Sequence, residues 1–373
     1  MALALTGARV FDGDSIRGGL AVIIEGKYIS AVVPDTLIPT GVTRQRLRGG
    51  LLAPGFIDVQ VNGGGGALLN ANPTAETVRR IASAHRKFGT TGLLPTVITD
   101  TPEVLAASIA AVKAALGNGV LGIHMEGPFL DVARKGAHEA RFIREVTQTD
   151  VTYLGTLDCG VVMLTVAPNR VQPAFISALT QNGVLVSLGH SDASFAEAQG
   201  ALAAGACGFT HLFNAMSQMS AREPGMVGAA LADHNSFTSL IADGHHVHNA
   251  VMAAALAARP KSRMMLITDA MPTAAGGPDS FELQTRTVRR NHGRLELGNG
   301  TLAGSDLTMD QAVRHCVTHL GVSLEDALRM AALNPACFIK QDHALGRVKE
   351  GYLASLVHLD DDLRVVATWV NGA

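Results

Sequence analysis

The sequence has almost no net charge and no run of basic residues. Its 373 residues include 30 lysines and arginines against 32 aspartates and glutamates, which leaves a net charge of −2. Proteins that bind nucleic acid or an anionic membrane surface need a local excess of positive charge. We therefore expect neither nucleic acid nor a membrane among the partners.

Paired cysteines and long apolar runs are also missing. The four cysteines lie far apart, at positions 159, 207, 316 and 337, which argues against a disulfide framework or a zinc ribbon and fits a reducing cytoplasm. No segment offers the roughly 18 uninterrupted apolar residues of a membrane span. The segment from Met1 to Leu5 lacks the charged and apolar regions of a signal peptide. These absences predict a cytoplasmic protein.

Apolar residues, in contrast, make up 47% of the chain and charged residues only 17%, so we expect a large buried core rather than disorder. The length suits one large domain and one small domain. The first residues form short apolar segments divided by turn pairs such as Asp12-Gly13 and Gly26-Lys27, and the chain returns to such segments at its end. We predict that residues 1–52 and 345–373 together form a small β-sandwich domain.

Residues 53–344 alternate between strand and helix patterns. Strands are predicted at residues 56–61, 91–97, 120–126, 161–166, 183–188, 207–212, 237–242 and 264–268. Helix starts are marked by Thr74, by Thr101 and by the capping box of Ser194 and Glu197. About eight strands with intervening helices predict an α/β fold, a (β/α)8 TIM-type barrel. An open doubly wound sheet is the alternative, and it is less favoured because no G-x-G-x-x-G motif follows the first strand.

A segment at residues 281–303 interrupts this alternation. Polar and apolar residues alternate there around Asn291-His292-Gly293 and Asn299-Gly300, which predicts an inserted β-hairpin. Two helices are expected after the insertion, at residues 309–319 and 324–332.

Side chains that can bind metal recur at the predicted ends of the strands, and in a barrel these ends meet at one rim. Glu126 ends the third strand, and His190 and His211 end the fifth and the sixth. A buried carboxylate is costly without a partner, and one oxygen with two nitrogen donors suits zinc with one open position. We predict that these three residues bind one divalent metal ion, zinc. For each histidine taken alone, a buried structural role is the alternative.

Asp269 ends the eighth strand beside this predicted metal site. Zinc lowers the pKa of a bound water toward about 7, and a neighbouring carboxylate can take the proton and pass it to a leaving amine. We predict that Asp269 is the general base and acid, with a cap of the following turn as the alternative. His124 points the same way as Glu126 along its strand, and we favour packing over a role behind the metal ligands.

Two amides stand where a second metal ion would need histidines. The first strand ends with Gln60 and Asn62, and amides are poor zinc ligands. The fourth strand ends in Thr165-Val166-Ala167-Pro168, without a lysine that could be carboxylated to bridge two ions. Gln60 and Asn62 therefore mark a vestigial second-metal position, and we expect one ion.

The run from Gly63 to Gly66 could suggest a phosphate loop. It lacks the Lys-Ser/Thr ending that such a loop needs. A tight, flexible turn is the favoured interpretation.

Several short motifs can be recognised along the chain. They are Pro54-Gly55-Phe56-Ile57-Asp58, His124-Met125-Glu126-Gly127-Pro128-Phe129, Lys135-Gly136-Ala137-His138, Gly189-His190-Ser191, Thr210-His211-Leu212-Phe213-Asn214-Ala215-Met216, Ala242-Asp243-Gly244 with His246, Thr268-Asp269-Ala270 and Leu302-Ala303-Gly304-Ser305. Together they resemble the amidohydrolase superfamily and, more closely, the N-acetylglucosamine-6-phosphate deacetylase family. The resemblance covers nearly the whole chain. It implies hydrolysis of N-acetylglucosamine 6-phosphate to glucosamine 6-phosphate and acetate.

The resemblance also assigns roles to residues. Glu126, His190 and His211 would hold the metal, Asp269 would activate the water, and His138 would polarise the acetyl carbonyl. The substrate-binding residues that it implies are Ala137, Asn214, Ala215, Arg222, His246, Leu302, Ala303 and Gly304. Many superfamily members carry H-x-H where this chain has Gln60 and Asn62, but some members of the deacetylase family share the amides. That departure therefore concerns the number of metal ions and not the reaction.

Phosphate would be met by Asn214, Ala215, Arg222 and His246. The forked guanidinium of Arg222 matches phosphate oxygens, and the alternative, an ion pair with Glu223, is disfavoured because adjacent side chains cannot easily face each other. In the family this arginine can come from the neighbouring subunit, which implies a homodimer. His245 stands where the resemblance leads us to expect an apolar residue.

Three alternatives remain open from the sequence. The same reaction could act on N-acetylgalactosamine 6-phosphate, because sequence does not separate the two epimers. A cyclic-amide hydrolase or aminoacylase on the same fold is disfavoured by the missing bridging lysine. A barrel that has lost its metal and serves as an interaction protein is disfavoured because Glu126, His190, His211 and Asp269 are all present.

Overall fold

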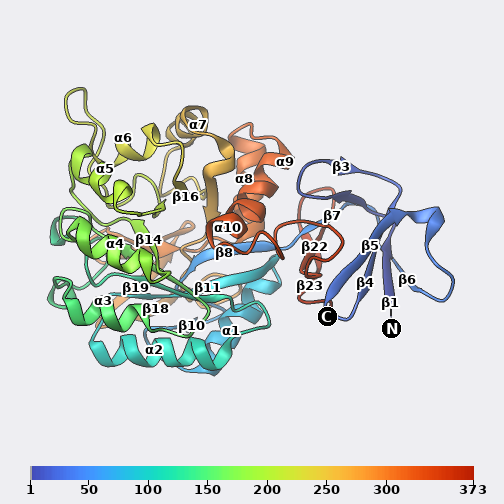
Figure 1. Cartoon of the computed structure of the whole chain (residues 1–373), viewed down its shortest axis with the longest axis horizontal. Helices are drawn as coiled ribbons and strands as arrows, with labels where there is room; N and C mark the ends of the chain where they lie inside the picture. Colours follow the sequence, from blue (N-terminus) through green and yellow to red (C-terminus); the bar gives the residue numbers. More distant parts are fainter. Residues whose placement is uncertain (1) are drawn as a thin grey trace.

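Eight parallel strands form the central barrel of the computed structural model, which describes residues 2–373 (Figure 1). In order around the barrel they are β8 (Phe56–Val61), β11 (Thr90–Ile98), β12 (Gly122–Glu126), β13 (Val161–Val166), β14 (Leu185–Leu188), β15 (Gly208–Phe209), β16 (Phe237–Ile241) and β17 (Met264–Ile267). The ring closes just beyond β17, where Val61 bridges to Ala270 and the Asp269 amide donates to the Gln60 carbonyl over 2.9 Å. The predicted TIM-type barrel is thus confirmed.

Helices surround the barrel on its outside (Figure 1). They are α1 (Ala75–Arg86), α2 (Pro102–Ala115), α3 (Gln148–Gly155), α4 (Pro173–Gln181), α5 (Phe195–Ala203), α6 (Gly225–Ala232), α7 (Asn249–Ala258), α8 (Met309–His319), α9 (Leu324–Ala331) and α10 (Leu333–Phe338). Thr74, Thr101 and Ser194 cap α1, α2 and α5 as predicted, because each side chain accepts a hydrogen bond from a backbone amide of the first turn. None of the described helices is long and apolar enough to cross a membrane.

A smaller unit beside the barrel is built from both ends of the chain (Figure 1). Its first sheet has the order β5 (Tyr28–Pro34), β4 (Leu20–Glu25), β1 (Ala2–Thr6) and β6 (Thr43–Arg46), and its second has β23 (Val365–Trp369), β22 (Leu356–Leu359), β7 (Leu51–Pro54), β2 (Arg9–Phe11) and β3 (Ile16–Arg17). Leu5, Leu52 and Trp369 belong to one buried apolar cluster that joins the two sheets.

The expected pairing of the two chain ends is confirmed by β22, which lies antiparallel to β7. The domain limits at residues 52 and 345 stay a prediction, and Met1 of that range lies outside the described residues.

The inserted segment is larger than the single hairpin that the sequence suggested. It forms a four-stranded antiparallel sheet, with β18 (Ser280–Leu283), β19 (Arg286–Asn291), β20 (Arg294–Leu297) and β21 (Leu302–Ser305) in that order. Leu283, Val288 and Leu295 are buried against Ile98 and Met271 at the rim of the barrel. The insertion is therefore packed where the strands end.

The glycine run forms two very short paired strands, β9 (Gly63–Gly64) and β10 (Ala67–Leu68), both buried. A Cβ at residue 64 would lie 2.5 Å from Nε2 of His85 on α1, so this position requires glycine for close packing. The turn is tight, as predicted, and its glycines allow α1 to approach the barrel.

Candidate active site

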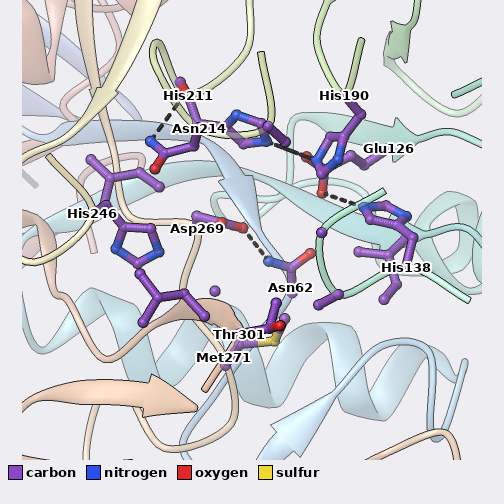
Figure 2. Close-up of a pocket in the computed structure, with 17 residues that line it drawn as sticks. Asn62, Glu126, His138, His190, His211, Asn214, His246, Asp269, Met271 and Thr301 are labelled. Atoms are coloured by element: carbon purple, nitrogen blue, oxygen red, sulfur yellow. Dashed lines mark hydrogen bonds and ion pairs between the residues drawn. The ribbon is translucent and has the colours of Figure 1, made fainter. Parts of the chain in front are cut away.

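A cavity of about 290 Å³ opens at the carboxyl ends of the barrel strands. Its lining includes most of the residues predicted for the site: Asn62, Glu126, Ala137, His138, His190, His211, Asn214, Ala215, His246, Asp269, Leu302 and Gly304. Figure 2 shows Asp269 between His246 on one side and the group of Glu126, His138 and His190 on the other. Gln60 and Ala303 are buried behind the lining, and Arg222 is exposed on a loop outside it.

The three predicted metal ligands converge on one point. Nε2 of His190 lies 3.2 Å and Nε2 of His211 lies 2.9 Å from the same Oε1 of Glu126, and the two nitrogens are 3.0 Å apart. Ligands of one tetrahedral zinc ion lie about 3.3 Å from one another when the metal–ligand distances are about 2.0 Å. The three donors are therefore spaced to share a single ion. A second donor set, Glu126, His138 and His190, also fits within 4.8 Å.

The protonation of His190 strengthens this interpretation. Its Nδ1 lies 3.0 Å from the carbonyl oxygen of Arg134, which can only accept a hydrogen bond, so Nδ1 carries the proton. In the neutral ring Nε2 then presents a lone pair toward the carboxylate of Glu126. Two lone pairs that face each other need a cation between them, and a backbone carbonyl behind the ring is the usual support of a metal-binding histidine.

Charge in the site also favours a cation. When a proton rather than a metal ion lies between the three donors, burial alone would raise the pKa of Glu126, but hydrogen bonds with His190 and His211 outweigh burial and hold that pKa well below its usual range. Burial alone would lower the pKa of His211, yet the nearby carboxylate of Glu126 raises it. A site that attracts a proton in this way also attracts a metal cation.

Asp269 is held by the amides of Gln60 and Asn62, the two residues predicted to mark a vestigial second-metal position. Nδ2 of Asn62 donates to its Oδ1 over 2.6 Å, and Nε2 of Gln60 donates to the same oxygen over 3.2 Å and to Glu126 over 2.9 Å. The amide oxygens of Asn62 and Gln60 are buried without a protein partner among the described residues. The side-chain N–H groups of Gln60 and Asn62 thus face the carboxylates of Glu126 and Asp269. In a site with two metal ions, a second cation would balance the negative charge of these carboxylates instead.

The backbone is unusual at three of the functional positions. His190, His211 and Asp269 have φ values of 47°, 38° and 51°, in the left-handed region that non-glycine residues seldom adopt. Each follows its strand by two residues, where the chain turns away from the barrel. Such conformations cost of order 1–3 kcal/mol each and cluster at functional sites, where they aim side chains into the cavity.

A layer of hydrogen-bonded side chains lies below the predicted metal ligands. His124 is fully buried, and its Nε2 lies 2.8 Å from Oγ1 of Thr165, which lies 2.8 Å from Oγ1 of Thr210. Thr210 in turn is 2.7 Å from Oγ of Ser187. Burial lowers the pKa of His124 to about 4, so the ring is neutral. His124 therefore packs beneath Glu126 within a polar network inside the barrel.

Two further histidines line or border the cavity. Nδ1 of His246 lies 2.6 Å from Oδ2 of Asp243, and both side chains are nearly buried. This hydrogen bond fixes the ring so that Nε2 is free to act in the cavity, and sequence reasoning did not assign Asp243 a role. His245 is exposed, and a Cβ at Gly293 would lie 3.0 Å from its Nε2. It therefore contacts the tip of the inserted sheet.

Sequence reasoning missed several residues that line the cavity: Ile98, Gly136, Ile241, Met271 and Thr301. Thr301 lies in the turn between β20 and β21 of the inserted sheet, and Ile98 and Ile241 end strands of the barrel. The strand-end rule that located Glu126 could have found the last two, but apolar side chains at these ends carry no chemical signal.

Comparisons with known proteins agree with this geometry. Residues 51–373 match the model of the amidohydrolase family, and residues 3–52 match that of the NagA composite domain. An N-acetylgalactosamine-6-phosphate deacetylase of Shewanella sp. (strain ANA-3) is 45% identical over 330 residues, which are 88% of this chain and 84% of that protein. An N-acetylglucosamine-6-phosphate deacetylase of Haemophilus influenzae is 33% identical over 378 residues, 100% of this chain and 99% of that protein. The crystal structure of N-acetylglucosamine-6-phosphate deacetylase from Pasteurella multocida has a TM-score of 0.97 at 34% identity and covers 100% of this chain and 99% of that one.

Proposed function

Because this chain belongs to the amidohydrolase family, we propose that it hydrolyses the N-acetyl group of N-acetylglucosamine 6-phosphate, giving glucosamine 6-phosphate and acetate. The observation that carries the proposal is the convergence of Glu126, His190 and His211 on one point, with Asp269 beside them in the same cavity. This is the arrangement that hydrolysis of an amide with metal assistance requires.

Glu126, His190 and His211 would hold one divalent ion, which we propose to be zinc because of their one oxygen and two nitrogen donors. When bound, such an ion polarises a carbonyl and lowers the pKa of water. The N–H groups of Gln60 and Asn62, directed at Glu126 and Asp269, support a single ion.

Asp269 is the proton carrier in this mechanism. Burial and the charge of Glu126 raise its pKa to about 6, close to the range in which a carboxylate exchanges protons readily near neutral pH. It takes one proton from the attacking water as the new C–O bond forms. It then delivers that proton to the amide nitrogen as the C–N bond breaks, so that the amine leaves without negative charge.

His138 is proposed to stabilise the acetyl oxygen. The side chain is buried, and burial together with the neighbouring His190 lowers its pKa to about 3, so the ring is neutral. A neutral ring can donate one N–H to the oxygen on which negative charge develops, which in comparable sites contributes about 3 kcal/mol.

The phosphate needs positive charge that one subunit does not supply. No lysine or arginine is found among the described residues that line the cavity. His246, Asn214 and Ala215 line it, and we propose that Arg222 of a second copy in a homodimer completes the phosphate site. Arg222 is exposed, and the carboxylate of Glu223 is engaged by the backbone amides of Phe195 and Gly225 instead.

N-acetylgalactosamine 6-phosphate is a second candidate substrate. It is favoured by one observation: the Shewanella relative named for that substrate is 45% identical, above the 33% of the Haemophilus relative named for the other epimer. The two sugars differ only in the orientation of one hydroxyl group, so the same metal and proton chemistry applies to both.

The decisive experiment is the release of acetate by the purified protein from both phosphorylated sugars. It is done after treatment with a chelator and again after zinc is added back. We expect turnover of at least one epimer, its loss with chelator and its recovery with zinc. Equal hydrolysis of unphosphorylated substrates would favour a different amide hydrolase, and absence of bound metal and of activity would favour an interaction protein.

A cytoplasmic location is also proposed, since all four cysteines are free thiols.

A further inference from the structure

We propose that Arg286, on the inserted sheet, is a positioning residue that fixes His138 in the active site. The inference rests on the proposed function, because it assigns Arg286 an effect on the step in which His138 takes part. Arg286 lies outside the cavity lining and touches neither the predicted metal ligands nor Asp269. Apart from a long hydrogen bond of 3.4 Å to Oε1 of Gln284 in its own turn, its side chain contacts the two residues on either side of His138.

Arg286 holds both neighbours of His138 at once. Its Nη2 donates a hydrogen bond to the carbonyl oxygen of Ala137 over 2.6 Å. Its Nε lies 2.9 Å from Oε1 of Glu139 in an ion pair, although the N–H is not aligned for a hydrogen bond. The side chains of Arg286 and Glu139 are each only 25% exposed, so water screens this ion pair less than it would at an open surface. A planar guanidinium can serve a carbonyl and a carboxylate together, whereas a lysine ammonium carries no fixed fork.

The imidazole of His138 has little to hold it in place by itself. Its Nδ1 is buried without a partner among the described residues. Its Nε2 lies 3.8 Å from Oε2 of Glu126, a contact that Figure 2 marks with a dashed line and that is too long for a hydrogen bond. The ring packs edge-on against His190 with centroids 4.5 Å apart. The position of the imidazole therefore depends on the backbone that carries it.

That backbone belongs to a loop whose two parts are anchored differently. The first part is tied to the barrel by Arg134, which forms an ion pair with Asp192 and accepts a hydrogen bond from His190. Near His138 the bonds within the loop come from Lys135, whose carbonyl accepts from the His138 amide over 3.0 Å. Within the loop, Nζ of Lys135 also donates to the carbonyl oxygen of His138 over 3.3 Å. From outside the loop, the side-chain clamp on residues 137–139 comes from Arg286.

The inserted sheet is itself fixed to the barrel close to this clamp. Gln284, in the turn before Arg286, donates to the carbonyl oxygen of Thr99 over 3.2 Å and to the carboxylate of Asp100 over 3.1 Å. Thr99 follows β11 directly, so the turn is anchored at the rim of the barrel. The insertion thus connects a barrel strand to the loop that carries His138 and sets the distance between them.

Removal of the clamp should act on the chemical step. We expect Arg286→Ala to lower kcat by about tenfold to a hundredfold with a smaller change in KM, since a displacement of about 1 Å in a catalytic group can cost a factor of this size. Arg286→Lys should keep part of the activity. The matched control is Arg289→Ala, an exposed arginine on the same strand, which should leave kcat unchanged.

A double-mutant comparison separates positioning from general damage. If Arg286 acts through His138, Arg286→Ala should have no further effect on kcat in a His138→Asn background. The proposal would be overturned if Arg286→Ala lowered kcat equally in both backgrounds, or if its kcat were the same as that of Arg289→Ala. Glu139→Gln, which keeps the bond to Ala137, provides a milder variant with a smaller loss in the same direction if Arg286→Ala does not fold.

A measurement without substrate keeps this inference separate from the proposed function. Amide hydrogen exchange in residues 136–140 should become faster in Arg286→Ala and stay unchanged in Arg289→Ala, whatever the substrate is. If the wild type releases no acetate, the proposed function fails. The exchange result still decides whether Arg286 holds the loop that carries His138. Unchanged exchange in Arg286→Ala would refute the clamp even in an active enzyme.

Discussion

The side-chain amide of Asn62 donates a hydrogen bond of 2.6 Å to Oδ1 of Asp269. The two residues are 207 positions apart in the chain, and both follow strands that close the barrel. Asp269 also lies near the charge of Glu126, which together with burial raises its pKa to about 6. The Asn62 bond opposes that rise, because it stabilises the ionised carboxylate that a general base needs.

The first prediction follows from this bond. Asn62→Leu removes the donor, so the pKa of Asp269 should rise, and the acidic side of the kcat/KM profile should move to higher pH. Asn62→Asp should move it further in the same direction, since a second negative charge also disfavours ionisation. Profiles are recorded with saturating zinc for all three proteins. A profile that does not move, or that moves to lower pH, would contradict the assignment of Asp269 as the base.

Asp269→Asn should abolish turnover but leave the metal bound. The amide keeps the shape of the side chain but cannot accept a proton, so we expect kcat to fall by about 10²- to 10⁴-fold, the usual contribution of a general base. Zinc content per subunit, measured on the purified variant, should stay equal to that of the wild type because Glu126, His190 and His211 are unchanged. Loss of zinc from the variant would mean that Asp269 acts chiefly as a ligand.

Much of the barrel could be predicted from sequence because its signals are local. The strand at residues 161–166 was predicted with its observed limits, and Ser194 and Glu197 form the predicted capping box of α5. Once eight strands alternate with helices, the strands run parallel, and all of their carboxyl ends therefore lie at one rim. This is why Glu126 and Asp269 could be expected to meet although 143 residues separate them, the difference of their positions.

Other parts depend on contacts that leave no pattern in the sequence. Arg286 reads as one of several arginines in an inserted strand, and only the folded chain brings it to Ala137, 149 positions away. Thr165 and Thr210 have the β-propensity expected of any strand residue, and the hydrogen bond between them appears only when the strands are arranged around one core. The phosphate-binding role of Arg222 is implied by the family resemblance and agrees with the fit of a guanidinium to phosphate, and its exposed position leaves that role as a proposal.

Gly304 should be essential for the shape of the site. Its φ is +63°, and an added Cβ would lie 2.6 Å from Cγ of Met271 and 2.8 Å from the carbonyl oxygen of Asp269. Gly304→Ala should therefore displace the Asp269 loop and lower kcat/KM by at least about tenfold. Gly300→Ala is the matched control, since Gly300 also has a positive φ, +81°, but an added Cβ there meets no atom within 4 Å. Similar activities of the two variants would show that steric contact at Gly304 is unimportant.

Asp58 should make the stability of the protein depend on pH. It is fully buried, and burial raises its pKa to about 7 against the opposing hydrogen bonds from Thr268 and Gln60. In the unfolded chain its pKa is about 3.9, so between these values the folded protein holds one more proton. The stabilisation from this group is complete below about pH 4 and is lost as the pH rises through about 7.

The test is the free energy of unfolding of wild type and Asp58→Asn between pH 5 and pH 7, measured with chelator so that metal binding does not contribute. The wild type should lose stability relative to the variant as the pH rises, by up to about 1.4 kcal/mol per pH unit. Parallel pH dependences of the two proteins would mean that Asp58 is ionised in the folded state.

Arg222 should act on the phosphate from the partner subunit of a homodimer. Arg222→Ala should raise KM for the phosphorylated sugar and leave the turnover of plain N-acetylglucosamine unchanged, because only the phosphate pairs with a guanidinium.

The stronger test mixes Arg222→Ala subunits with Asp269→Asn subunits, each nearly inactive as a homodimer at low substrate concentration. In a mixed dimer one site has an intact Asp269 and receives Arg222 from the other subunit. Random mixing of equal amounts makes about half of the dimers mixed, and one of the two sites in each mixed dimer is intact. About a quarter of the wild-type activity should therefore return. If Arg222 served its own subunit, every site in the mixture would lack one of the two groups and no activity would return.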